Sequence, residues 1–91
     1  MTGPERDPVV GDLREQISEL DRSIFDAVNR RLVLVAQLKK YKEAQGYSFV
    51  DAGREADMIA AQVDANPGPL SDEGVRALYS ELLALTKREV R

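Results

Sequence analysis

The sequence contains no cysteine, no histidine and no tryptophan. Without cysteine the chain can form no disulfide, no thiol nucleophile and no cysteine-based metal site. Without histidine it lacks the commonest metal ligand and the usual general base, so we expect no metal site and no serine triad. Aromatic residues make up only 5% of the chain, which gives no support to a platform for stacking bases.

Charge and hydropathy exclude further classes of function. Thirteen Lys and Arg residues stand against sixteen Asp and Glu, a formal net charge of -3, and no basic run is present to follow a nucleic-acid backbone. No apolar run approaches the ~20 residues that span a bilayer, and the first residues lack the charged-then-apolar order of a secretory signal. For these 91 residues we expect one small cytoplasmic domain that binds neither nucleic acid nor membrane.

One helical pattern dominates the chain, from Asp12 to Gln45. Asp12 and Glu15 have the spacing of a helix cap and its third-position partner, and Gly46 tolerates the left-handed conformation common just past a helix. Residues 1–11, with two prolines and two glycines, are predicted to be a flexible tail, which leaves 12–91 as the domain. Apolar residues recur every three or four positions, as on one face of a helix, at Leu13, Ile17, Leu20, Ile24, Ala27, Val28, Leu34, Val35 and Leu38.

Two shorter helices follow. Asp51 is a natural N-cap for a helix that runs to about Ala65, and the Pro- and Gly-containing segment 66–69 ends it. Ser71 can cap a third helix from Asp72 to about Glu89. The sequence thus predicts an all-α chain of three helices, the first of them very long.

The length of the first helix predicts a dimer. About 33 residues at 1.5 Å each give a rod of roughly 50 Å, which exceeds the diameter of a compact domain of this size. The two shorter helices cannot cover its whole apolar stripe. We therefore expect an obligate, two-fold symmetric homodimer in which a second copy covers the rest.

Three charged residues occupy positions where the helical period calls for an apolar side chain. Arg31 and Lys42 lie eleven positions apart, which at about 100° per residue places them within roughly 20° of each other on the face that should be buried. Glu55 lies on the inner stripe of the second helix. One interpretation is a buried ion network in which Glu55 neutralises one of the cations. The other is a site for a small organic acid, because an arginine fork and a lysine charge complement carboxylates and a developing oxyanion.

Arg14 lies seventeen positions before Arg31 and so faces about 100° away from it. In an antiparallel dimer of long helices, the beginning of one helix lies near the far end of its partner, where Arg14 could complete the partner's site. The alternative is an exposed arginine in the first turns of a helix. At the other end of the chain, the apolar stripe of the third helix continues to Thr86 and then Val90.

These residues lie in segments that resemble the all-helical class of chorismate mutases. The resemblance runs from about Leu13 to the C-terminus, with the segments in matching order and spacing. It is carried by LREQISELDRSIFDAVNRR, KKYKEAQG, VDAGREADMI and GPLSDEGVRALYSELLALT. In that family an intertwined dimer of three-helix chains binds chorismate, a dianion. The family converts it to prephenate, in aromatic amino-acid biosynthesis, by an intramolecular rearrangement that needs no acid, base or cofactor.

The resemblance also implies roles for residues of the first two helices. Arg31 and the partner's Arg14 would hold the two substrate carboxylates. Lys42 would donate to the ether oxygen, which gains negative charge as the C–O bond breaks. The C4 hydroxyl of the substrate would donate to Glu55, with Asp51 helping to fix that group and Arg54 supporting the site.

The third helix keeps one family feature and loses another. Thr86 stands where the family commonly has a small hydroxyl residue, but Val90 stands where it has a Gln or Glu that is the second donor to the ether oxygen. Losing one such donor costs about 10²–10³ in rate, so we expect a weak mutase. Three explanations stay open: an activating enzyme of the shikimate pathway, a related substrate such as 4-amino-4-deoxychorismate, or a substitute donor from Lys87 or Arg91. More distant alternatives are an isochorismate pyruvate lyase and a non-catalytic helical dimer module.

Overall fold

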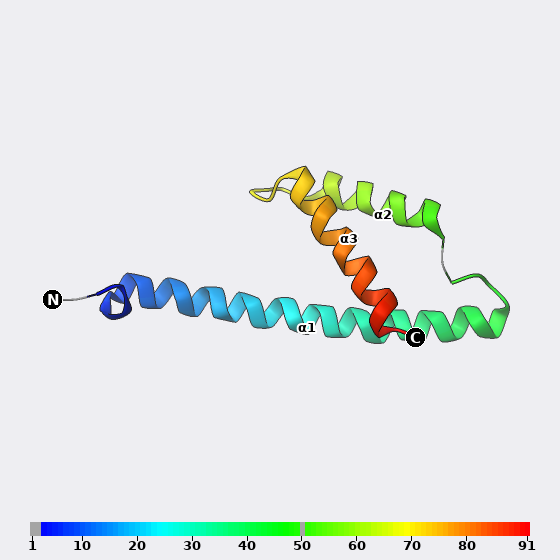
Figure 1. Ribbon diagram of the computed structural model, residues 1–91, viewed down its shortest axis with the longest axis horizontal. Coiled ribbons are helices and arrows are strands. Elements are labelled where there is room, and N and C mark those ends of the chain that lie inside the picture. Colours follow the sequence, from blue (N-terminus) through cyan, green and yellow to red (C-terminus); the bar gives the residue numbers. More distant parts are fainter. Residues whose placement is uncertain (1–2, 50) are drawn as a thin grey trace. The chain divides into compact units, whose positions relative to one another are not determined.

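The computed structural model describes residues 3–49 and 51–91, apart from the side chain of Ala52. These residues form a short 3-10 turn, Pro4–Arg6, and three α-helices: α1, Pro8–Gln45; α2, Ala52–Ala65; and α3, Asp72–Glu89 (Figure 1). No strand occurs in this part of the chain, which confirms the all-α class. Met1 and Thr2 of the predicted tail lie outside the described residues.

The chain divides into two compact units, and α1 contributes to both. The first unit, Met1–Val33, holds the 3-10 turn and the first part of α1. The second, Leu34–Arg91, holds the end of α1 together with α2 and α3.

The predicted start of the long helix is wrong, because α1 begins at Pro8 rather than after Asp12. Asp7 provides the cap: its Oδ1 accepts a hydrogen bond from the Val9 amide at 2.9 Å, and its carbonyl accepts the first helical bond from the Gly11 amide at 3.0 Å. Proline suits the first helical position, since its φ is already helical and its missing N–H would have had no partner there. Residues 8–11, predicted as tail, therefore extend the helix by one turn.

The predicted end of α1 is confirmed. Gly46 follows the last helical residue with φ of +74°, the left-handed conformation that glycine adopts without steric cost. The Tyr47 amide donates to the Lys42 carbonyl at 2.8 Å, and the Gly46 amide donates to the Glu43 carbonyl at 3.2 Å. This pair of bonds satisfies two carbonyls that the last turn would otherwise leave without partners.

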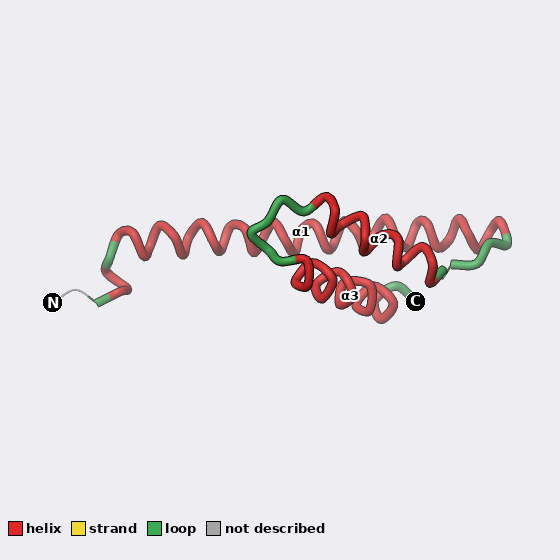
Figure 2. Tube along the Cα trace, turned by 90° about the horizontal axis from the view of Figure 1, so that it is seen from above, coloured by secondary structure: helices red, strands yellow, loops and turns green. Residues whose placement is uncertain are grey.

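In the second unit, α2 and α3 pack against each other and are joined by a short loop (Figure 2). The bounds of both helices and their caps are as predicted. The Asp51 and Ser71 side chains accept hydrogen bonds from the amides of Arg54 and Gly74, at 3.1 and 3.0 Å. In the loop, the Asn66 side-chain amide donates to the Leu70 carbonyl at 2.7 Å.

The single chain buries very little. Among the described residues only Val75 and Thr86, both on α3, are buried, with 8% and 6% of their surfaces exposed. Tyr79 of α3 reaches α2, where its hydroxyl lies 3.8 Å from the Met58 sulfur. Large apolar side chains of α1 remain exposed, and none of the helices in the described part of the chain is long and apolar enough to cross a membrane.

Candidate functional site

The beginning of α2 brings three of the predicted site residues together. Asp51 caps the helix through Oδ1, and its carbonyl accepts from the Glu55 amide at 3.1 Å. Arg54 supplies the amide that the Asp51 carboxylate binds, and its own side chain is exposed. The free amides of a helix N-terminus favour acidic groups, so the position suits the carboxylates of both Asp51 and Glu55. The cap thereby fixes the backbone from which Glu55 projects.

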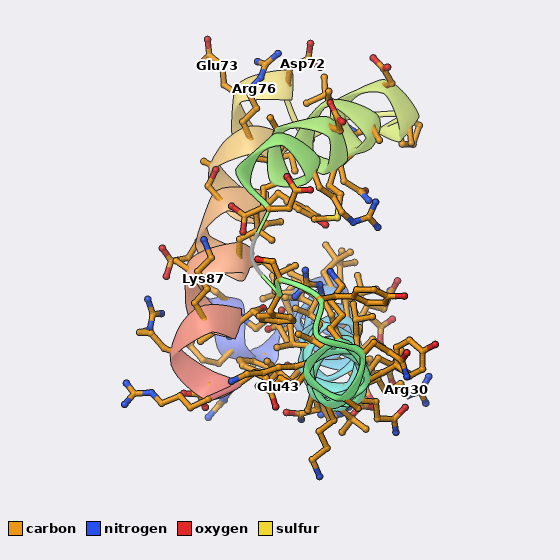
Figure 3. All side chains as sticks on the ribbon, turned by 90° about the vertical axis from the view of Figure 1, so that its right-hand side faces the viewer. Arg30, Glu43, Asp72, Glu73, Arg76 and Lys87 are labelled. Carbon is orange, nitrogen blue, oxygen red and sulfur yellow. The ribbon has the colours of Figure 1, made fainter. Side chains whose placement is uncertain are left out.

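Glu55 forms an ion pair with Lys87 of α3. The Lys87 ammonium lies 3.0 Å from Oε1 and 3.3 Å from Oε2, so it contacts both carboxylate oxygens. The Glu55 side chain is 26% exposed and that of Lys87 is 50% exposed. Figure 3 shows Lys87 far along α3 from Asp72 and Glu73, which begin that helix. The sequence predicted Arg31 or Lys42 as the counter-ion of Glu55, and Lys87 only as a substitute donor to the substrate.

Lys42 lies in the last turn of α1 and is half-buried, as its place on the apolar stripe predicted. Its ammonium is 6.0 Å from the centre of the Phe49 ring, and that of Lys39 is 5.9 Å from the same ring. These distances are at the outer limit of a cation–π interaction, so each is a weak contact. The half-buried Phe49 thus provides an apolar surface beside the Lys42 charge.

Val90 lies directly after the last residue of α3, and the end of that helix at Glu89 is as predicted. The helix ends at Glu89, and Val90 is its cap, with φ of -103° and an amide that donates to the Thr86 carbonyl at 2.8 Å. The buried Thr86 hydroxyl donates to the Leu82 carbonyl, one turn earlier in α3, at 2.7 Å. Arg91, the other substitute donor considered, directs its Nε to the Arg88 carbonyl at 3.1 Å.

Arg14 and Arg31 lie on the part of α1 that belongs to the first compact unit, whereas the other predicted site residues belong to the second. Arg31 is half-buried, as its place on the stripe predicted, and Arg14 is exposed. Within the second unit, the structure joins the beginning of α2 to the end of α3 through Glu55 and Lys87. Among the described residues, no three acidic side chains come together as a metal-binding group would require.

Comparison with known proteins identifies the family of this arrangement. Residues 13–90 match the family described as chorismate mutase type II. One similar solved structure is form I of chorismate mutase from Thermus thermophilus, with a TM-score of 0.81 and 28% identity over 85% of this chain and 96% of that one. Form II of the same enzyme gives a TM-score of 0.84 and 29% identity over 90% of this chain and 94% of that one. The search of curated proteins finds no match.

Proposed function

The chain belongs to the chorismate mutase type II family, and from this premise we propose that it is an isomerase that converts chorismate to prephenate. The observation that carries this proposal is the family match over residues 13–90, which includes α2, α3 and all of α1 after its first five residues. The reaction is intramolecular, so catalysis requires the reactive conformer to be held and donors to be placed where charge develops. A chain with no histidine and no cysteine is suited to this chemistry.

In the proposed site the cations of α1 bind the substrate. Arg31 and the partner's Arg14 hold the two carboxylates, for which the planar guanidinium is well shaped. Lys42 donates to the ether oxygen as the C–O bond breaks. Its half-buried position beside Phe49 supports this role, because a charge shielded from water interacts more strongly with a developing oxyanion.

The beginning of α2 binds the C4 hydroxyl of the substrate. Glu55 accepts a hydrogen bond from that hydroxyl, Asp51 helps to fix the same group, and Arg54 supports the site. The Asp51 cap supports this assignment, since it holds the first turn of α2 rigid.

Val90 makes the enzyme weak when it acts alone. A valine offers no side-chain donor, and one preorganised donor to an oxyanion contributes about 10²–10³ in rate. Of the two substitute donors considered, Arg91 directs its Nε to the Arg88 carbonyl, and the Lys87 ammonium is paired with Glu55. Activation by a partner enzyme of the shikimate pathway would compensate for this loss.

A homodimer completes the enzyme. The apolar stripe of α1 is exposed in the single chain, with Leu20 at 64% and Ile24 at 58%. Burial of one such side chain contributes about 1.5–3 kcal/mol, so a second copy that covers the stripe gains considerable stability. The partner subunit would also bring its own Arg14 to the site.

A direct assay tests the proposed function. The full chain is incubated with chorismate, loss of substrate is followed by ultraviolet absorbance, and the product is identified by mass spectrometry. Lys42→Ala should lower kcat/KM by at least about 10²-fold, because it removes the donor to the ether oxygen. Lys40→Ala, which removes an exposed lysine of the same helix, should leave the rate unchanged. Absence of prephenate from the wild-type reaction, at any enzyme concentration, would refute the proposal.

A further inference from the structure

The Lys87–Glu55 ion pair differs from the other ion pair described in the chain. Arg88 and Glu81 are both on α3 and are largely exposed, with their closest atoms 3.2 Å apart. Lys87 and Glu55 instead connect α3 to α2, and the carboxylate is three-quarters shielded from solvent. The pair therefore places a positive charge beside the carboxylate that, in the proposed function, accepts a hydrogen bond from the C4 hydroxyl of the substrate.

The geometry of the pair limits what else Glu55 can bind. The Lys87 ammonium contacts both oxygens, at 3.0 and 3.3 Å. An ionised carboxylate offers about four lone-pair sites, so further acceptor sites stay available for another donor. A neutral hydroxyl can use one of them without any conflict of charge. An ammonium that binds the same oxygens would lie within a few ångströms of the Lys87 ammonium, and the two like charges would repel each other.

We propose that Lys87 is a specificity-determining residue, which makes the site select a hydroxyl rather than an ammonium group at C4 of the substrate. This inference rests on the proposed function, in which Glu55 receives the C4 substituent. It assigns the chain to chorismate and against 4-amino-4-deoxychorismate, although the Glu55 carboxylate considered alone would favour the amine. Lys87 acts through Glu55 and is a positioning residue, not a catalytic one.

The test compares two substrates on four proteins. Wild type, Lys87→Met, Lys87→Arg and Arg88→Met are assayed with chorismate and with 4-amino-4-deoxychorismate, and the ratio of the two kcat/KM values is determined. Lys87→Met keeps the length and helix propensity of the side chain but removes its charge, and it should shift the ratio toward the amine by about tenfold. Lys87→Arg retains the charge and should retain the wild-type preference. Arg88→Met breaks the neighbouring Arg88–Glu81 pair and should leave the ratio unchanged.

The outcomes separate this inference from the proposed function. If wild type converts chorismate and Lys87→Met leaves the ratio within twofold of wild type, the specificity role is refuted and the proposed function stands. A ratio that moves equally in Lys87→Arg also refutes it, because the effect would then not depend on charge. If wild type converts neither substrate, both proposals fail together. Circular dichroism confirms that each variant is helical, and Lys87→Gln replaces Lys87→Met if the latter does not fold.

Discussion

Replacement of Val90 by glutamine should raise kcat/KM for chorismate by about tenfold. A preorganised donor to a developing oxyanion contributes about 2.7–4 kcal/mol. Val90 lies just past the last helical residue, with φ of -103° and ψ of 95°, so a glutamine there is less rigidly held than one inside α3. Ordering its side chain costs up to about 1.5–2 kcal/mol. A net gain of about 1–2 kcal/mol remains, and this corresponds to a factor of about 5–30.

The same substitution has a cost in stability that can be measured separately. Val90 is half-buried, and complete burial of a valine contributes about 1.5–3 kcal/mol, so its loss should lower the free energy of unfolding by about 1 kcal/mol. Urea denaturation at a fixed protein concentration measures this cost, while the chorismate assay measures the gain. Higher activity combined with lower stability would identify a catalytic effect.

Two controls make the result decisive. Val90→Leu keeps an apolar side chain and should not raise activity, and Arg91→Gln places the same amide one position further along the chain. If Val90→Gln folds and its kcat/KM equals that of wild type, the end of α3 does not face the ether oxygen, and the explanation of weak activity is wrong. An equal rise in Val90→Leu would show that packing, and not a donor, is responsible.

Two further predictions concern the long helix. Gly46→Ala should lower the free energy of unfolding by about 1 kcal/mol or more, because Gly46 has φ of +74°. Gly11→Ala, inside α1, should instead raise it by up to about 1 kcal/mol. A Cβ meets nothing within 4 Å at either site, so equal effects of the two substitutions in urea denaturation would contradict this account. Ile24→Glu should convert the dimer to a monomer, as measured by sedimentation velocity, because Ile24 lies on the exposed apolar stripe of α1. Arg22→Glu, about 200° around the same helix, should leave the dimer intact. A monomeric wild type, or a dimer that survives Ile24→Glu, would contradict the proposed interface.

Local signals in the sequence were sufficient for α2 and α3. Asp51 and Ser71 each satisfy a free amide three residues ahead, so the side chain that caps the helix also marks its start in the sequence. The start of α1 was not predicted correctly, because two acidic residues compete for the capping role. Asp12 has the capping-box spacing to Glu15, but Asp7 precedes a proline whose fixed φ already suits a helix. The sequence pattern gives no means of ranking these two starts.

The ion pair between Glu55 and Lys87 could not be predicted from local patterns. The two residues are thirty-two positions apart, and their meeting depends on how α2 and α3 pack along each other. The helical period predicted correctly that Glu55 lies on the shielded side of α2, but it contains no information about the register between two helices. Contacts of this kind are a property of tertiary packing, whereas the Asp51 cap and the Thr86–Leu82 bond join residues three or four positions apart.

The Glu55–Lys87 ion pair, which the sequence did not predict, changes the net charge of the proposed site. Arg31, Lys42 and Glu55, together with the partner's Arg14, carry two net positive charges, which balance the two negative charges of chorismate. Lys87 raises the net charge of the site to three positive charges, and this excess of positive charge favours the more negative of two competing substrates. A 4-amino analogue carries one net negative charge less, so Lys87 disfavours it both by repulsion at C4 and by overall charge. Removal of Lys87 should therefore weaken binding of the hydroxyl substrate while it strengthens binding of the amine, and this opposite response distinguishes a charge effect from general damage to the fold.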